Sequence, residues 1–155
     1  MPTDIFGGRN YQFGIERQGG SINTMATVGV NLPGVFEFFL DGEQYGVFIH
    51  QDGRVVTPAA PALPGEILTV FYTGGGKTDP PTATGELASG IHHTERTAIV
   101  KINGQTVPML FSGLTPGFFG LYQANFEMNG ARGAAEFTIE HAGAVSKVVN
   151  LLAQP

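Results

Sequence analysis

The stretch from Gly113 to Met128 constrains the fold more than any other part of this chain. It opens with a corner in which Pro116 presets φ for a turn and Gly117 accepts a positive φ without steric cost. Beyond the corner, alternate residues are apolar or aromatic and share one face: Tyr122, Ala124 and Phe126. Such alternation is typical of a half-buried β-strand. The sequence therefore predicts that the chain reverses or changes sheets at the corner and then continues as a strand.

Tyr122 carries a second signal. Together with Leu114 and Pro116, it is similar to the tyrosine corner of Greek-key sandwiches. In that motif a tyrosine at the start of a late strand donates a hydrogen bond back to the preceding connection. We therefore expect the Tyr122 hydroxyl to bond to the corner before it.

Short alternating segments recur along the chain, and turn signals separate them. The expected strands cover residues 35–40, 44–49, 66–72, 97–102, 105–111, 122–127, 135–140 and 145–152, with turns at 41–42, 103–104 and 141–143. Asp-Gly and Asn-Gly between apolar runs are strong hairpin signals. The chain has 23 glycines, 10 prolines and only 14% charged residues, which suits many short strands. This pattern predicts an all-β fold, with a β-sandwich as its architecture.

Two connections stand out between these strands. Residues 57–65 include three prolines, which lack the N–H donors of a central strand, so we expect an extended crossing between sheets. Residues 66–72 then form a nearly continuous apolar strand, which is expected to be central. Residues 74–91 are a long loop rich in glycine, proline and threonine, and compact domains seldom contain such a loop without a function.

Residues 1–30 form an N-terminal extension to a domain that spans residues 31–155. A strand is predicted over residues 10–17, because Tyr11, Phe13 and Ile15 alternate with polar residues and glycine. The alternative is an arm without regular structure.

Composition excludes several classes of protein. The formal net charge of -5 argues against a nucleic-acid-binding protein, which needs a basic surface for phosphates. The absence of cysteine excludes disulfides and thiolate metal sites. No segment approaches the roughly 20 apolar residues of a membrane helix, so membrane insertion is not expected. The N-terminus has no signal-peptide pattern, and an exported protein would have its signal outside this chain.

Several segments resemble a known family in the family's own order: 32–36, 51–53, 58–67, 72–74, 102–104 and 113–125. They are similar to an uncharacterised C-terminal domain repeated in acidobacterial, Solibacter-type secreted proteins. The resemblance covers about residues 31–155, and 113–123 is its most specific part. It implies an immunoglobulin-like Greek-key β-sandwich at the end of a secreted or cell-surface protein with no established activity. Residues 1–30 and 92–95 depart from the family.

A cluster of potential metal ligands lies at His92, His93 and Glu95, and His50 and His141 can join it in space. Adjacent side chains on a strand point to opposite faces, so His92 and His93 can share an ion only from an irregular loop. The simpler interpretation is that these residues are ordinary polar side chains of an exposed loop. Further carboxylates that suit calcium occur at Asp41, Glu43, Asp52 and Asp79, without an EF-hand pattern. We therefore predict no metal site.

Catalytic motifs are not recognisable in this sequence. Residues 74–78 read Gly-Gly-Gly-Lys-Thr, but Phe71 stands where a phosphate-binding loop needs glycine, and 79–81 block the following helix. None of the serines considered as nucleophiles lies in a Gly-x-Ser-x-Gly elbow: Ser21, Ser89, Ser112 and Ser146. No glycosidase carboxylate pair is marked. We predict no enzyme, no catalytic residue and no cofactor.

Phe118 and Phe119 cannot both point inward from the corner. We expect one of them to cap the end of the sandwich, and the alternative is an interaction surface.

The leading functional hypothesis is a non-enzymatic structural module of an exported or cell-surface protein. Its N-terminal arm would add a strand to a neighbouring copy, because open sheet edges accept extended segments. The partner would be a second copy or another surface protein. The alternative is an accessory domain of a larger secreted protein that binds a glycan or a metal through residues 74–96.

Overall fold

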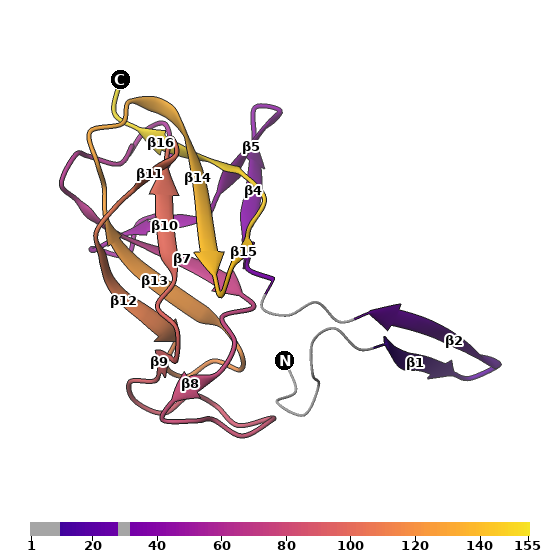
Figure 1. Cartoon of the computed structure of the whole chain (residues 1–155). Coiled ribbons are helices and arrows are strands. Elements are labelled where there is room, and N and C mark those ends of the chain that lie inside the picture. Colours follow the sequence, from indigo (N-terminus) through magenta and orange to yellow (C-terminus); the bar gives the residue numbers. More distant parts are fainter. Residues whose placement is uncertain (1–9, 28–31) are drawn as a thin grey trace.

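A computed structural model describes residues 10–27 and 32–155 of the chain (Figure 1). In sequence order its strands are β1 (Asn10–Arg17), β2 (Gly20–Thr27), β3 (Gly34–Val35), β4 (Glu37–Leu40), β5 (Glu43–Gly46), β6 (Phe48–His50), β7 (Ile67–Thr73) and β8 (Thr78–Asp79). They continue as β9 (His93–Thr94), β10 (Ile99–Ile102), β11 (Gln105–Thr106), β12 (Met109–Leu114), β13 (Tyr122–Glu127), β14 (Gly133–His141), β15 (Ala144–Val145) and β16 (Val149–Ala153). The predicted all-β class is confirmed. The described ranges contain no helix suited to spanning a membrane.

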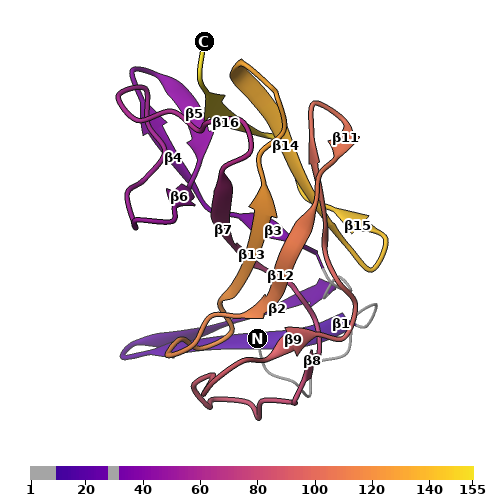
Figure 2. The same cartoon turned by 90° about the vertical axis from the view of Figure 1, so that its left-hand side faces the viewer.

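Two sheets enclose one core (Figures 1 and 2). Within residues 32–155, the first runs β11-β10-β14-β16-β5-β4 with β15 on β14, and the second runs β3-β7-β13-β12-β9-β8 with β6 on β7. Neighbouring strands are antiparallel except for β16 and β5, which pair in parallel. This arrangement confirms a sandwich-like all-β architecture. The predicted central position of β7 is also confirmed, because β13, β3 and β6 all pair with it.

One hairpin joins the two sheets at a side of the sandwich. The first arm of the hairpin consists of β3, in the second sheet, and β4, in the first sheet. The second arm consists of β5, in the first sheet, and β6, back in the second sheet. The two arms change sheets at Phe36 and Val47, and there the Val47 N–H donates a hydrogen bond of 2.8 Å to the Phe36 carbonyl. The predicted turn at residues 41–42, which joins β4 to β5, is confirmed, with φ of 52° at Asp41 and 85° at Gly42. The expected strand 105–111 was wrong in one respect, since it divides into β11 and β12 in different sheets.

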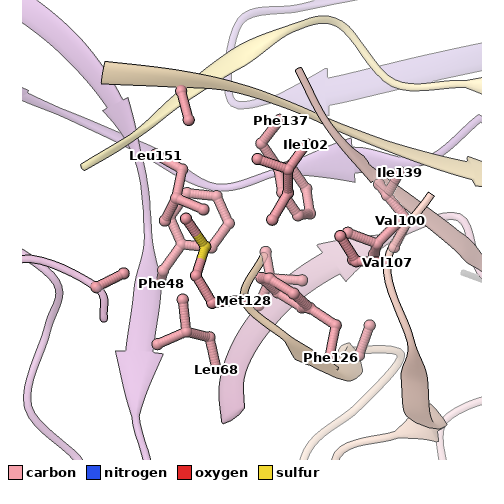
Figure 3. Close-up of a cluster of buried hydrophobic side chains, with 14 of the residues drawn as sticks. Phe48, Leu68, Val100, Ile102, Val107, Phe126, Met128, Phe137, Ile139 and Leu151 are labelled. Carbon is pink, nitrogen blue, oxygen red and sulfur yellow. The ribbon is translucent and has the colours of Figure 1, made fainter. Parts of the chain in front are cut away.

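The core lies between the sheets, and aromatic rings from both sides meet in it (Figure 3). Phe48 packs edge-on against Phe137 at a centroid distance of 4.8 Å, and Phe126 lies 5.4 Å from Phe137. Phe126 and Ala124 are both buried on β13, as the alternation predicts. The reversal before β13 is confirmed as well, because β12 pairs antiparallel with β13.

The tyrosine-corner expectation was wrong. The Tyr122 hydroxyl donates to the carbonyl of Gly76, in the loop after β7, instead of to the corner that precedes its own strand. Gly75 leaves room for this contact, since a Cβ there would lie 2.3 Å from the Tyr122 ring. The phenol therefore ties together two segments that are far apart in sequence.

The prediction that segment 57–65 crosses between sheets was wrong, because β6 and β7, which flank it, both lie in the second sheet and pair with each other. The segment instead contacts the first sheet from the side through Ala62. The Ala62 N–H donates to Leu152, and its carbonyl accepts from Gln154, both over 2.9 Å. Ala62 thereby links the connection between β6 and β7, which lie in the second sheet, to β16 of the first.

Candidate functional site

The N-terminal hairpin, defined as β1 and β2, is the region of the described chain that the sandwich does not include. The strands pair over their full length, with Ile15 opposite Ile22 and Arg17 opposite Gly20. At the turn Gly19 has φ of 103°, a conformation that side chains with a Cβ adopt rarely. The predicted strand 10–17 is confirmed as β1, but sequence analysis missed its partner β2. Figure 1 shows the hairpin projecting away from the sandwich.

Apolar side chains on this hairpin face solvent. Ile15 is 67% exposed and Ile22 is 70% exposed, and their cross-strand pairing puts them on the same face. Every residue of β2 is exposed. In the described residues the hairpin is a separate two-stranded sheet, so each strand has an edge without a strand partner. Two-stranded hairpins alone are only marginally stable in water, and this one would gain stability from a covering surface.

The sandwich has an open edge of its own at β4. Among the strands that the structure describes, β4 pairs only with β5, and it is longer than β3, β8 and β11, which end the other sides of the two sheets. Phe39 on this strand is 73% exposed. The one charge of the strand, on Glu37, is compensated by Lys147 at 2.9 Å. Natural edge strands are commonly protected by shortness, proline or free charges, and β4 has little of this protection.

His92 is held inside the loop that follows β8. Its ring is buried, with Nδ1 at 2.7 Å from the Pro80 carbonyl and 3.1 Å from the Thr82 hydroxyl. Its Nε2 lies 3.0 Å from the Ser89 carbonyl. The backbone is fixed by the sheet, because the Leu114 N–H donates to the His92 carbonyl over 2.9 Å. Both ring nitrogens are therefore occupied by the chain itself.

The other members of the predicted metal cluster do not gather around His92. His93 is exposed, its ring packs on Phe111 at 5.1 Å, and Asp79 lies opposite it in the β8–β9 pair. Glu95 is exposed. Across residues 10–27 and 32–155, no three histidine, aspartate or glutamate side chains are arranged to hold a metal ion. The carboxylates considered for calcium are dispersed over two turns and two strands: Asp41, Asp52, Glu43 and Asp79.

His50 and His141 each hydrogen-bond to a backbone carbonyl in a segment between strands, Ala60 between β6 and β7 and Arg96 between β9 and β10. The His50 ring lies between Glu66, at 2.5 Å from Nδ1, and the Ala60 carbonyl, at 3.0 Å from Nε2. His141 donates from Nε2 to the Arg96 carbonyl over 2.7 Å, and its buried Nδ1 has no hydrogen-bond partner among the described residues. Burial lowers the pKa of His141 from its ordinary value of 6.5. His141 is therefore favoured as the neutral Nε2–H tautomer.

The remaining candidates for chemistry have structural contacts. The Ser112 hydroxyl lies 2.8 Å from Thr94 and 3.1 Å from the Tyr72 hydroxyl in a buried cluster. Burial raises the pKa of Tyr72 to about 12. Ser146 donates to the Lys147 carbonyl and accepts from the Ile139 N–H. The glycine-rich segment 74–78 leads into β8 and not into a helix, so it lacks the form of a phosphate-binding loop.

The expectation that Phe118 or Phe119 caps the sandwich was wrong. Phe118 is 54% exposed and Phe119 is 65% exposed. The corner instead pairs with the long loop, because the Ala88 N–H donates to the Phe118 carbonyl and the Gly117 N–H donates to the Ala88 carbonyl. Leu87 and Ile91 of that loop are exposed too. We call the four exposed apolar side chains of these two paired segments the end patch: Leu87, Ile91, Phe118 and Phe119.

No known protein family, curated protein or solved structure matches this chain in the three comparisons. The resemblance to the acidobacterial domain consequently stays a prediction.

Proposed function

We propose that this chain is a non-enzymatic structural module whose N-terminal hairpin joins it to a neighbouring copy. The observation that carries the proposal is the exposure of Ile15 and Ile22 on one face of a hairpin with open edges. Exposed apolar surface and unpaired strand edges both favour association, since burial of each releases water or completes hydrogen bonds. We assign the module to the immunoglobulin-like sandwiches of secreted or cell-surface proteins, on the resemblance given above.

The β4 edge is the receiving surface in this proposal. An added strand would pair its N–H and carbonyl groups with the outer edge of β4, in the mode known as strand addition. Phe39 beside this edge would then contact the apolar face that contains Ile15 and Ile22. Donor and acceptor are different surfaces of one chain, so the interface is head-to-tail, and repeated addition produces filaments where the rotation between copies does not close a ring.

The experiment compares the mass in solution of matched variants by light scattering over a range of concentrations. The parent chain is expected to grow in mass with concentration. Ile15→Thr with Ile22→Thr should remove this growth, since threonine retains β propensity but loses apolar area. Met25→Thr is the matched control, because Met25 is equally exposed but lies on the opposite face of the hairpin.

The receiving edge is tested separately. Phe39→Lys places a charge of the kind that blocks natural edges, and it should leave the protein monomeric. Leu110→Lys adds the same charge at an exposed position of β12, which has strand partners on both sides, and should not affect assembly. A parent chain that stays monomeric at all concentrations would contradict the proposal, as would assembly that survives in both hairpin and edge variants.

The alternative function is a glycan-binding or metal-binding accessory domain. The end patch favours its glycan form, because exposed aromatic rings stack on sugars. It predicts that Phe118→Ala with Phe119→Ala abolishes binding to a glycan array, while the parent chain binds. A parent chain without affinity for any glycan on the array would contradict it.

A further inference from the structure

Asparagine followed by glycine occurs at two places in this chain, Asn103-Gly104 and Asn129-Gly130. In this dipeptide the backbone nitrogen of glycine can attack the side-chain carbonyl carbon of asparagine, because no Cβ hinders its approach. The product is a cyclic succinimide, and ammonia is released. The reaction in a folded protein depends on where the fold holds the two groups, so the surroundings of each copy decide its reactivity.

Asn103 is held on the side of its strand that faces β14. The Asn103 N–H donates to the Glu136 carbonyl over 2.8 Å, and its Oδ1 accepts from the Glu136 N–H over 2.9 Å. Gly104 belongs to the turn that leads into β11, which lies on the opposite side of β10 from β14. The carboxamide is therefore turned toward β14, away from the Gly104 nitrogen, and the bond to Glu136 has to break before the two can react.

Asn129 bends back over its own backbone instead. Its Oδ1 accepts from the Ala131 N–H over 3.0 Å, two residues along the chain. An N–H can only donate, so this bond also fixes which atom of the carboxamide is the oxygen. In such an Asx turn the side chain follows the path of a backbone turn, and Cγ then lies beside the peptide nitrogen of the next residue, Gly130. Electrophile and nucleophile are thus neighbours in the folded chain.

The groups that the reaction needs are available at this position. Among residues 10–27 and 32–155, the Gly130 N–H has no hydrogen-bond partner, so its nitrogen is free to lose its proton and attack. The Ala131 N–H donates to the oxygen on which negative charge develops, as a donor of an oxyanion hole does. Nδ2 of Asn129 lies 3.5 Å from the Ile102 carbonyl, which is longer than the usual range for a hydrogen bond, so the leaving amine is weakly held.

Water, the second reactant, has access to this position. Asn129, Gly130 and Ala131 line a hollow of about 360 Å³ together with Asn103 and Gln105. Gly130 itself is exposed. A succinimide formed here would therefore be open to hydrolysis.

We propose that Asn129 is a self-modification site, at which the fold positions the chain for its own deamidation. The Gly130 nitrogen forms a bond to Cγ of Asn129, the bond from Cγ to Nδ2 breaks, and ammonia leaves with the proton of the Gly130 N–H. Water then opens the succinimide at either of its carbonyls, which gives aspartate or isoaspartate. The reaction uses no oxidant or reductant, and the loss of ammonia makes it one-way.

The modification changes the connection from β13 to β14, which passes from the second sheet to the first. It adds one negative charge to a chain whose formal net charge is -5. A carboxylate at position 129 cannot donate to the Ile102 carbonyl, and isoaspartate lengthens the backbone of the connection by a methylene group. The connection therefore differs chemically between newly made and aged molecules.

Peptide mapping by mass spectrometry tests the proposal on protein aged at neutral pH and physiological temperature. Each deamidation exchanges an NH2 group for OH and changes the peptide mass accordingly. In the folded protein Asn129 should deamidate at least about tenfold faster than Asn103. In the same protein unfolded in guanidinium chloride the two sites should react at similar rates, because the reacting dipeptides are identical. Equal rates in the folded protein would overturn the proposal, as would a slower reaction of Asn129 in the folded than in the unfolded protein.

A glycine substitution tests the succinimide route. A Cβ at Gly130 meets no atom within 4 Å, and Gly130 has no positive φ, so Gly130→Ala should retain the fold. Its methyl group hinders the attacking nitrogen, and deamidation of Asn129 should slow at least about tenfold. Gly20→Ala, at a hairpin position with the same freedom, is the matched control and should leave the rate unchanged. An unchanged rate in Gly130→Ala would contradict the attack by this nitrogen.

Discussion

Strand β1 of the N-terminal hairpin and strand β14 have similar alternating patterns, but the hairpin and β14 lie in opposite environments. β14 buries Ala135, Phe137 and Ile139, because β10 and β16 flank it and the second sheet covers one of its faces. The hairpin has strands of nearly the same length, yet it leaves Ile15 and Ile22 in solvent. Alternation therefore specifies a strand, whereas burial of its apolar face requires a second layer. Among residues 10–27 and 32–155 no second layer covers the hairpin, and in the proposed assembly a neighbouring copy supplies that layer.

The largest expected effect separates the two regions by stability. Phe137→Ala removes a fully buried ring that packs on Phe48 and Phe126, and we expect it to lower the free energy of unfolding by about 3–5 kcal/mol. Ile22→Ala, at an exposed position, should change it by less than about 0.5 kcal/mol. Urea unfolding of dilute protein, followed by circular dichroism, measures both. A large loss in Ile22→Ala would show that the hairpin is an integral part of the folded domain.

A smaller effect is expected from one substitution made in a turn of each region. Gly104 has φ of 76° in a turn of the sandwich and Gly19 has φ of 103° in the hairpin, and a Cβ at either position meets no atom within 4 Å. Alanine in such a conformation costs about 1–2 kcal/mol through backbone strain alone. Gly104→Ala should therefore lower the melting temperature of the sandwich. Gly19→Ala should leave it unchanged and weaken assembly instead, as measured by light scattering. Equal melting shifts would contradict the distinction between the regions.

The smallest expected effect is a pH dependence that belongs to the sandwich alone. Because burial lowers the folded-state pKa of His141 below 6.5, the unfolded chain binds more protons once the pH falls below that value. The contribution of His141 to stability is complete above pH 6.5, and it is lost as the pH falls through the folded-state pKa. His141→Gln retains an N–H donor for the Arg96 carbonyl, and it should reduce the slope of the unfolding free energy against pH, measured by urea unfolding from pH 7.5 to 5. His93→Gln, at an exposed position, should retain it. An unchanged slope in His141→Gln would assign the pH dependence to other groups.

Much of the secondary structure could be predicted, because its signals are local. The Asn103-Gly104 turn was predictable because these residues tolerate the φ values of 50° and 76° that the turn needs. The β2 strand was missed, because Gly20–Thr27 has few apolar residues and weak alternation. The sheet changes around Phe36 and Val107 left no local signal either, since pairing with a different sheet depends on neighbours that are distant in sequence.

The candidate sites were harder to predict, because their geometry depends on contacts between segments. Sequence analysis grouped His92 with His93 by adjacency, but the fold buries one ring and exposes the other. The partners of His92 lie 3 and 12 residues away, and only the path of the loop reveals that two carbonyls face one ring. The bond from Tyr122 to Gly76 spans 46 residues and was likewise not foreseeable.

The sequence by itself determined that this protein is built from short strands, where most of its turns lie, and which faces of β13 and β14 are apolar. These properties follow from backbone sterics and side-chain alternation within a few residues. The tertiary structure alone decided that, within the described part of the chain, no second layer covers the hairpin and β4 ends a sheet, and that the His92 ring contacts carbonyls near both ends of a loop. Those outcomes depend on which distant segments meet, because burial and hydrogen bonding are shared between partners that no local pattern identifies.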